Sequence, residues 1–311
     1  MAKFERPRIF RPPSEWMSYY LPLTSGCSNN TCIFCYYYGS RLQIRDLADV
    51  KAEIDALHLF RTRGVVVPGM DQTVYMLASQ WDGRRVFIQD GDALVYPFPK
   101  LLEALDYLNE KFPNLERIAV YATAQDILRR SAEELRLLKE RKLTILYIGL
   151  ESGDDDILRD IGKNTNSEEM VAAAQRVRDA GLTLSVMVIL GLGGMERSEQ
   201  HALATADTLS RMDPEFGAAL TLTVVPGTPL DARIQRGEFH PISPFQSLEE
   251  LRTIIRNLTV TQCFFSSMHA SNYLTLRGTL PDDKDKMLRT LDKVIEKGDP
   301  GMLRPEGFRG L

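Results

Sequence analysis

The chain has 311 residues, of which 44% are hydrophobic and 26% are charged. This composition is that of a globular protein with a substantial core, and it excludes disorder as the main state. The net charge is −4, from 38 Lys and Arg against 42 Asp and Glu. A mildly acidic chain has no global positive field that would attract nucleic acid or an anionic membrane.

The chain also lacks the patterns of membrane insertion and export. No uninterrupted apolar stretch approaches the ~18 residues that a transmembrane helix needs, and the first 16 residues lack the apolar centre of a signal peptide. We therefore expect a cytoplasmic protein that does not enter a membrane.

Short apolar runs alternate with amphipathic stretches through the middle of the chain. We expect strands at residues 16–23, 85–90, 117–123, 144–152, 182–194 and 217–225. We expect helices between or after them at residues 46–60, 98–112, 126–140, 167–181 and 197–211. About six strand-then-helix units with nearly continuous apolar strands indicate a parallel sheet covered by helices.

Six units fall short of the eight in a complete barrel. We therefore predict an α/β fold, a partial (β/α)6 TIM-like barrel with a C-terminal helical extension, and an ordinary doubly wound sheet is the alternative. In both folds, ligands bind at the C-terminal ends of the strands.

The chain is expected to divide into three parts. Residues 1–16 form an N-terminal extension, residues 17–235 the barrel, and residues 236–311 an extension that closes the barrel. Within this last part we expect helices at 246–258 and 282–298 on either side of an irregular segment at 262–281.

Three of the four cysteines, Cys27, Cys32 and Cys35, lie within nine residues directly after the first expected strand. In a reducing compartment, clustered thiols favour metal ligation over disulfides. A structural zinc site normally has four ligands, and no fourth Cys or His is nearby. A [4Fe–4S] cluster held by three thiolates leaves one iron open for a substrate or cofactor.

Other readings of the cysteines remain open. They can be inert buried side chains, zinc ligands with a remote partner, or a redox pair at Cys32 and Cys35 with a bystander. If the cysteines bind zinc together with a remote ligand, the protein would be a non-catalytic zinc-binding protein. With the remote Cys263 as a fourth ligand, it would be an iron–sulfur electron-transfer protein.

The C-x4-C-x2-C spacing, with Phe34 before the last cysteine, resembles the signature of the radical S-adenosylmethionine (SAM) superfamily, whose commonest form is C-x3-C-x2-C. The resemblance covers roughly residues 17–230. It implies a partial barrel, and a [4Fe–4S] cluster on Cys27, Cys32 and Cys35 whose open iron binds the amino and carboxylate groups of SAM. It also implies reductive cleavage of SAM to a 5′-deoxyadenosyl radical that abstracts hydrogen from a substrate.

Two further motifs fit this family. Asp90, Gly91 and Asp92 follow the second expected strand, where the family has a Gly-Gly-Glu-like turn that binds the SAM amino group; an ordinary polar turn is the alternative. The Gly-Leu-Glu-Ser-Gly stretch at 149–153 resembles the branch containing tRNA methylthiotransferases and the catalytic subunit of Elongator. The resemblance implies that Glu151 and Ser152 face the SAM ribose and that Lys163 binds a carboxylate.

The end of the strand at 182–194 matches the family in part. Ile189 and Gly191 fit a GxIxGxxE pattern whose backbone flanks the adenine, whereas Gly194 stands where the pattern has Glu. Among later residues, His269, Tyr273 and Cys263 are candidates for contact with substrate or for hydrogen donation. The alternative for these three is a capping loop and a buried cysteine without a chemical role.

The substrate is not identified by the sequence. The net charge favours a small molecule or a peptide over tRNA, and a reductant such as flavodoxin or ferredoxin is the expected electron donor. We also expect no room for the N-terminal domain and the RNA-binding module of methylthiotransferases.

Overall fold

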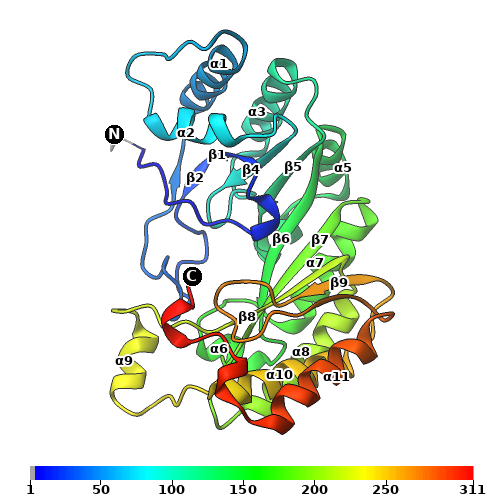
Figure 1. Cartoon of the computed structure of the whole chain (residues 1–311). Helices are drawn as coiled ribbons and strands as arrows, with labels where there is room; N and C mark the ends of the chain where they lie inside the picture. The colour runs from blue at the N-terminus through cyan, green and yellow to red at the C-terminus, as the bar shows by residue number, and fades with distance from the viewer. Residues whose placement is uncertain (1–3, 311) are drawn as a thin grey trace. The chain divides into compact units, whose positions relative to one another are not determined.

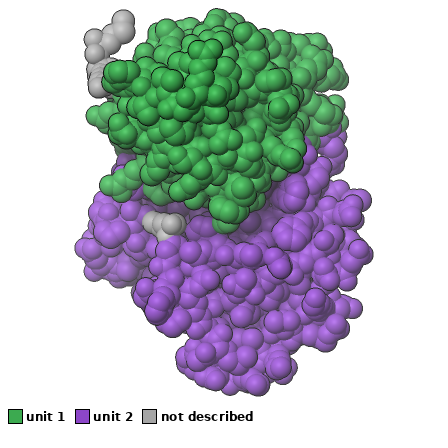
Figure 2. Space-filling view, turned by 45° about the horizontal axis from the view of Figure 1, so that its top comes forward, with its two compact units in different colours: residues 1–30, 39–147, 179–182 green, residues 31–38, 148–178, 183–311 purple. Residues whose placement is uncertain are grey.

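The computed structural model describes residues 4–310. It contains two compact units that alternate along the chain (Figure 2). Unit 1 comprises residues 1–30, 39–147 and 179–182, and unit 2 comprises residues 31–38, 148–178 and 183–311.

Unit 1 is built on a parallel sheet with the strand order β1-β4-β5-β6. Its strands are β1 (Tyr19–Pro22), β4 (Arg85–Gln89), β5 (Arg117–Tyr121) and the first part of β6 (Leu143–Glu151), with a small antiparallel pair of β2 (Thr24–Ser25) and β3 (Gln43–Ile44). The β4 segment shows why the sheet forms here: Val86, Phe87 and Ile88 are consecutive and all fully buried, as expected for a strand covered on both faces.

Apart from η1 (Pro13–Glu15), which precedes β1, the helices of unit 1 follow strands along the chain (Figure 1). They are α1 (Leu47–Arg63), α2 (Gln72–Gln80), α3 (Phe98–Lys111), α4 (Ala124–Arg129) and α5 (Ala132–Glu140). Asp46 caps the N-terminus of helix α1, because its side chain accepts a hydrogen bond from the Ala48 N–H. The helix packs against α2 and α3.

Unit 2 has the strand order β6-β7-β8-β9-β10. The end of β6 is followed by β7 (Thr183–Leu190), β8 (Phe216–Thr221), β9 (Cys263–Ser266) and β10 (Arg277–Leu280). Strands β7, β8 and β9 are parallel, whereas β10 is antiparallel to β9. The pairing of Leu190 with Thr221 places the C-terminal ends of β7 and β8 at one edge.

The helices of unit 2 include three long ones that lie side by side, α8, α10 and α11 (Figure 1). The set is α6 (Asp155–Asp160), α7 (Ser167–Asp179), α8 (Ser198–Met212), α9 (Pro229–Gln235), α10 (Pro244–Asn257), α11 (Lys284–Lys297), η2 (Pro300–Met302) and η3 (Glu306–Phe308). Helix α10 begins with a capping box in which Ser243 and Gln246 satisfy each other's backbone N–H groups.

The six expected parallel strands are present as β1, β4, β5, β6, β7 and β8, so the α/β prediction is confirmed. Two local expectations were wrong. The helix expected at 126–140 is interrupted, because Ser131 caps a new helix through a capping box with Glu134. The segment expected to be irregular at 262–281 contains β9 and β10, where alternating burial is typical of strands.

The three-part division of the chain at residues 16 and 235 stays a prediction. Within residues 4–310, none of the helices combines the length and the apolar character that crossing a bilayer requires.

Candidate active site

The expected cluster cysteines occupy a short segment that passes from one unit to the other. Cys27 belongs to unit 1, and Cys32 and Cys35 belong to unit 2. No disulfide joins any of the four cysteines. Among the described residues, no group of three or more His, Cys, Asp or Glu side chains is arranged to hold a metal ion.

In unit 1, the loop after β1 is hydrogen-bonded to the turn after β4. The Gly26 N–H donates to Asp90 Oδ2 at 2.9 Å, and the Cys27 thiol lies 3.8 Å from the Gly91 carbonyl oxygen. The Asp90 N–H donates to Thr24 Oγ1 at 3.2 Å. The loop that carries Cys27, the first predicted cluster ligand, is therefore held against the turn that is predicted to bind the SAM amino group.

Asp92 ends this turn inside the protein and is fully buried. Its Oδ2 accepts a hydrogen bond from Ser28 Oγ, whereas its Oδ1 is buried and has no hydrogen-bond partner within residues 4–310. Burial and the neighbouring Asp126 raise the pKa of Asp92 well above its ordinary value. Asp126, which the sequence reasoning missed, is held in turn by Thr123 Oγ1 at 2.7 Å and by Arg129.

In unit 2, Cys32 is buried close to charged groups. Burial raises the pKa of its thiol to about 11, while Lys163 acts in the opposite direction. The chain around Cys32 is fixed through its neighbours, because the Ile33 N–H donates to the Ile161 carbonyl and the Ile33 carbonyl accepts from the Leu230 N–H. Phe34 packs against a buried apolar cluster that includes Leu192.

Glu151 and Lys163 form an ion pair with 2.8 Å between Oε1 and Nζ. Glu151 is the last residue of β6, and both side chains are only 13% exposed. Gly149 makes this placement feasible, since a Cβ at that position would lie 1.9 Å from Glu151 Oε1. Two of the residues predicted to contact SAM are thus brought together at the C-terminal end of a strand.

Ser152 is fully buried behind this pair, and its hydroxyl is already engaged. It is 2.8 Å from His201 Nδ1 and accepts a hydrogen bond from the Asp154 N–H at 3.1 Å. In the structure described here, Ser152 supports the turn after β6, and its predicted contact with the SAM ribose stays a prediction.

The end of β7 carries the predicted adenine-flanking backbone. The Ile189 carbonyl lies 3.0 Å from His201 Nε2, and the Gly191 N–H donates to Glu250 Oε2 at 2.7 Å. Neither His201 nor Glu250 was singled out from the sequence. The signal that could have found them is a titratable residue on the core-facing side of an amphipathic helix, next to Ala202 in α8 and Leu251 in α10.

The segment with His269 and Tyr273 is fastened to the C-terminal end of β8. The Thr221 N–H donates to Ser271 Oγ at 3.1 Å, and His269 Nδ1 accepts from the Ser271 N–H at 3.1 Å. Burial and nearby Arg304 lower the pKa of His269, which favours the neutral imidazole.

Arg309, also missed from the sequence, clamps the same segment. Its guanidinium donates to the Ser271 carbonyl at 2.6 Å and the Leu222 carbonyl at 2.9 Å, and it stacks over the Tyr273 ring with 4.2 Å to the centroid. Tyr273 additionally donates to Glu306 at 2.7 Å. Burial raises the pKa of Tyr273 to about 12, so it stays protonated at neutral pH.

Cys263 lies elsewhere in unit 2. It is fully buried at the start of β9, beside the N-terminal end of β8, because Phe264 pairs with Phe216. Strand β8 has six residues, and at ~3.3 Å per residue its two ends are roughly 20 Å apart. Cys263 is therefore remote from the strand end that carries Gly191 and His269.

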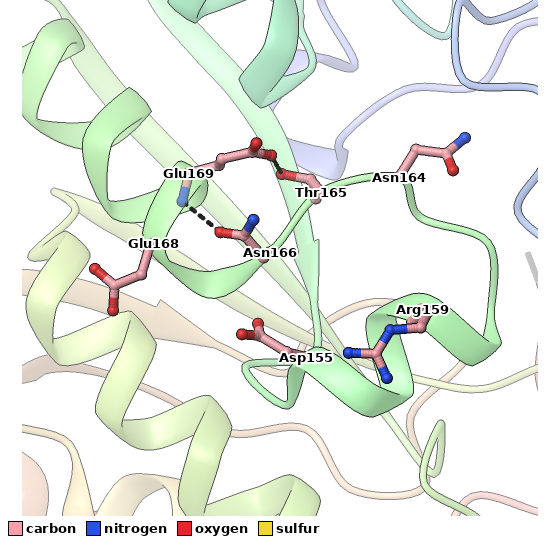
Figure 3. A pocket seen from close by; sticks show the side chains of 7 residues that line it. All are labelled: Asp155, Arg159, Asn164, Thr165, Asn166, Glu168 and Glu169. Atoms are coloured by element: carbon pink, nitrogen blue, oxygen red, sulfur yellow. Dashed lines mark hydrogen bonds between the residues drawn. The ribbon is translucent and has the colours of Figure 1, made fainter.

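An open polar pocket of about 610 Å³ lies in unit 2 where the loop after α6 leads into α7 (Figure 3). The residues that line it are Asp155, Arg159, Asn164, Thr165, Asn166, Glu168 and Glu169. Several of these polar groups form hydrogen bonds with one another; for example, Thr165 Oγ1 donates to Glu169 Oε2 at 2.9 Å (Figure 3). None of them was predicted as a site residue, and the pocket does not define the active site.

Comparison with known proteins identifies the family. The family model of the radical SAM superfamily matches residues 21–206, which is more than half of the chain. The chain therefore belongs to the radical SAM superfamily and is an enzyme of this class. Members of the superfamily use a [4Fe–4S] cluster and SAM.

Two curated relatives and one solved structure illustrate the likeness. The chain is 27% identical over 181 residues to the heme chaperone HemW of Bacillus subtilis (strain 168), covering 57% of this chain and 46% of the relative. It is 29% identical over 228 residues to tRNA-2-methylthio-N(6)-dimethylallyladenosine synthase of Leifsonia xyli subsp. xyli (strain CTCB07), covering 70% and 37%. The chain thus spans less than half the length of these two relatives.

The solved structure of coproporphyrinogen III oxidase (HemN) from Escherichia coli, a radical SAM enzyme, matches with a TM-score of 0.53 at 15% identity. The match covers 77% of this chain and 51% of that chain. At this identity the likeness concerns the fold, and it confirms the expected TIM-like barrel class.

Proposed function

We propose that this chain cleaves SAM reductively at a [4Fe–4S] cluster bound by Cys27, Cys32 and Cys35, and that the resulting radical abstracts hydrogen from a substrate. The observation that carries the proposal is the joining of the cysteine loop to the Asp-Gly-Asp turn in unit 1. Cys27 contacts the Gly91 carbonyl, and the preceding Gly26 N–H donates to Asp90.

The residues fit the two groups on chemical grounds. Three thiols within nine residues match three corners of a cluster with one open iron. Within residues 4–310 the buried Oδ1 of Asp92 has no hydrogen-bond partner, and the ammonium group of the SAM methionine moiety would donate to it and favour the ionised carboxylate. We propose Asp90, Gly91 and Asp92 as the turn that binds this ammonium group.

The remaining contacts come from unit 2. Lys163 would neutralise the SAM carboxylate, and Glu151 would accept hydrogen bonds from the ribose. The backbone at Ile189 and Gly191 would flank the adenine, and Phe34 would cover the cluster side of the loop through its apolar packing.

Cys27, Cys32 and Cys35 would hold the cluster, which would supply the one electron needed for reductive cleavage of the C–S bond of SAM. The chain's own residues orient the cofactor and keep water away from it. Cys32 is only 6% exposed, so the cluster bound there would be shielded from water on that side.

The test is anaerobic reconstitution with iron and sulfide, followed by incubation with dithionite and SAM. We expect release of 5′-deoxyadenosine, measured by mass spectrometry, and a change in the electron paramagnetic resonance spectrum of the reduced cluster when SAM is added. The Cys27→Ala, Cys32→Ala and Cys35→Ala variants should each lose the cluster. Fully iron-loaded, reducible protein that releases no 5′-deoxyadenosine would overturn the proposal.

The two alternatives from the sequence are less well supported. Family membership argues against a zinc-binding scaffold. The position of Cys263 beside the opposite end of β8 argues against an electron-transfer cluster that uses it as a fourth ligand.

The substrate class and the reductant are also proposals. We propose a small-molecule or peptide substrate and a flavodoxin or ferredoxin as the electron donor. A tRNA substrate is the competing choice, because one relative is a tRNA-modifying synthase. Comparing 5′-deoxyadenosine release in the presence of small-molecule extracts, peptides and bulk tRNA would distinguish the classes.

A further inference from the structure

Two buried titratable side chains in unit 2 have no part in the proposed function so far. His201 lies on α8 and Glu250 on α10, and their exposed fractions are 0% and 2%. Burying such groups is costly unless they are hydrogen-bonded, so their contacts need an explanation.

His201 links the ends of two strands. Its Nε2 lies 3.0 Å from the Ile189 carbonyl oxygen, which can only accept, so Nε2 carries the proton. Its Nδ1 must then be the acceptor, and the Ser152 hydroxyl 2.8 Å away is the donor. One ring therefore joins the turn after β6, through Ser152, to the last residues of β7, through Ile189.

Glu250 holds the next residues of the same turn. Its Oε2 accepts from the Gly191 N–H at 2.7 Å, and its Oε1 accepts from Ser198 Oγ at 2.7 Å. Both carboxylate oxygens are thus used, one for the turn after β7 and one for the start of α8. Glu250 Oε2 also lies 3.9 Å from His201 Nε2, so the two side chains form one buried group.

We propose that His201 and Glu250 are positioning residues that hold the ends of β6 and β7 in the arrangement that SAM binding requires. The inference rests on the proposed function, because Glu151, Ile189 and Gly191 are the residues it would place. Gly194 stands where the family pattern has a glutamate, and Glu250 supplies a carboxylate to the same turn from a helix 59 residues further along the chain.

The pKa values of the two side chains are shifted in opposite directions by burial. Burial raises the pKa of Glu250 to about 7 and lowers the pKa of His201 to about 4. Between these values Glu250 is protonated and His201 is neutral, so neither side chain carries a charge. A group that carries no net charge can stay buried beside the turn without an external counter-ion.

The experiment compares Glu250→Ala with Glu250→Gln and with the control Glu249→Ala, whose side chain is exposed on the same helix. Gln can still accept from the Gly191 N–H and can donate to Ser198, whereas Ala can do neither. Hydrogen–deuterium exchange is measured on the protein as isolated, and KM for SAM and kcat for 5′-deoxyadenosine release are measured after reconstitution.

We expect Glu250→Ala to accelerate exchange at least tenfold in the segment 189–197, with little change in unit 1, and to raise KM for SAM more than it lowers kcat. Glu250→Gln should recover most of both effects. Unchanged exchange in 189–197, or a uniform increase over the whole chain, would overturn the proposal. If Glu250→Ala does not fold, Ser198→Ala tests the same anchor by removing one of its two hydrogen bonds.

The two proposals can fail separately. Wild-type protein that is reducible and iron-loaded but releases no 5′-deoxyadenosine would refute the proposed function, and the local exchange would still decide whether Glu250 anchors the turn.

Discussion

Thr31 donates a hydrogen bond from its hydroxyl to the Gly162 carbonyl at 2.7 Å, so the residue just before Cys32 rests directly on the turn after α6. The contact is close enough to exclude any side chain at position 162. A Cβ there would lie 2.4 Å from the Thr31 carbonyl oxygen, and the φ of Gly162 is +72°.

We therefore predict that Gly162→Ala destabilises the protein by ~2–4 kcal/mol, combining the strain of a left-handed residue with the displacement of backbone. It should also lower the iron content after reconstitution, because Thr31 must move. Urea denaturation and iron analysis test this prediction. The matched control is Gly237→Ala, which has a φ of +70° but no atom within 4 Å of its Cβ. Equal losses in the two variants would show that the contact with Thr31 contributes nothing.

The His201–Glu250 pair predicts opposite pH dependences for two single variants. The pKa of Glu250 rises from 4.5 to about 7 on folding, so its contribution to the free energy of unfolding is present below pH 4.5 and is lost as the pH rises through 7. The pKa of His201 falls from 6.5 to about 4, so its contribution is present above pH 6.5 and is lost as the pH falls through 4. The two effects oppose each other between about pH 4.5 and 6.5.

Removing one member should expose the effect of the other. Relative to wild type, Glu250→Gln should lose stability on acidification from pH 6.5 to 4.5, and His201→Gln should lose stability as the pH rises over the same range. Urea denaturation at several pH values measures both slopes, and differences from wild type remove the contribution of other carboxylates such as Asp154, which also acts on His201. Slopes of the same sign in both variants would contradict this account.

The raised pKa of Asp92 predicts that Asp92→Asn stabilises the protein at neutral pH. Because burial and Asp126 raise the pKa of Asp92 in the folded state, its contribution to stability is lost as the pH rises above its ordinary value of 3.8. An Asn at this position carries no such penalty, and its amide can donate to Asp126. Urea denaturation at several pH values should show that the gain in unfolding free energy grows with pH. The control is Asp49→Asn, which removes an exposed carboxyl group of the same unit and should show no comparable trend. A less stable Asp92→Asn protein at pH 7 would refute the assignment.

Cys263→Ala should retain the iron–sulfur cluster. Its thiol is fully buried beside the N-terminal end of β8, and burial raises its pKa to about 12, which disfavours the thiolate that binds iron. The measurement is iron and sulfide content after reconstitution, with Cys35→Ala as the comparison that loses the cluster. Loss of iron in Cys263→Ala, in protein that remains folded by circular dichroism, would restore the electron-transfer alternative.

Sequence reasoning was most successful where function depends on neighbours along the chain. Cys27, Cys32 and Cys35 are separated by only a few residues, so their spacing can be recognised in the sequence. The apolar runs of β4 and β7 likewise predict buried strands. The parallel sheet followed from the alternation of strands with helices, whereas the strand order was not predicted.

Contacts between distant segments could not be predicted in this way. Glu250 reaches Gly191 across 59 residues, Ser152 reaches His201 across 49, and Arg309 reaches Leu222 across 87. No local pattern encodes which carbonyl or N–H group a buried side chain will meet. What the sequence does contain is a weaker sign, a charged residue on the apolar face of a helix, as at Glu250 in α10.

The clamp made by Arg309 has a practical consequence for handling the protein. Its side chain is 6% exposed and ties the final turn to two carbonyl oxygens near the strand ends. Replacing Arg309 with Ala should therefore loosen the segment that carries His269 and Tyr273 and lower the melting temperature, so preparations of this protein should keep residue 309 intact.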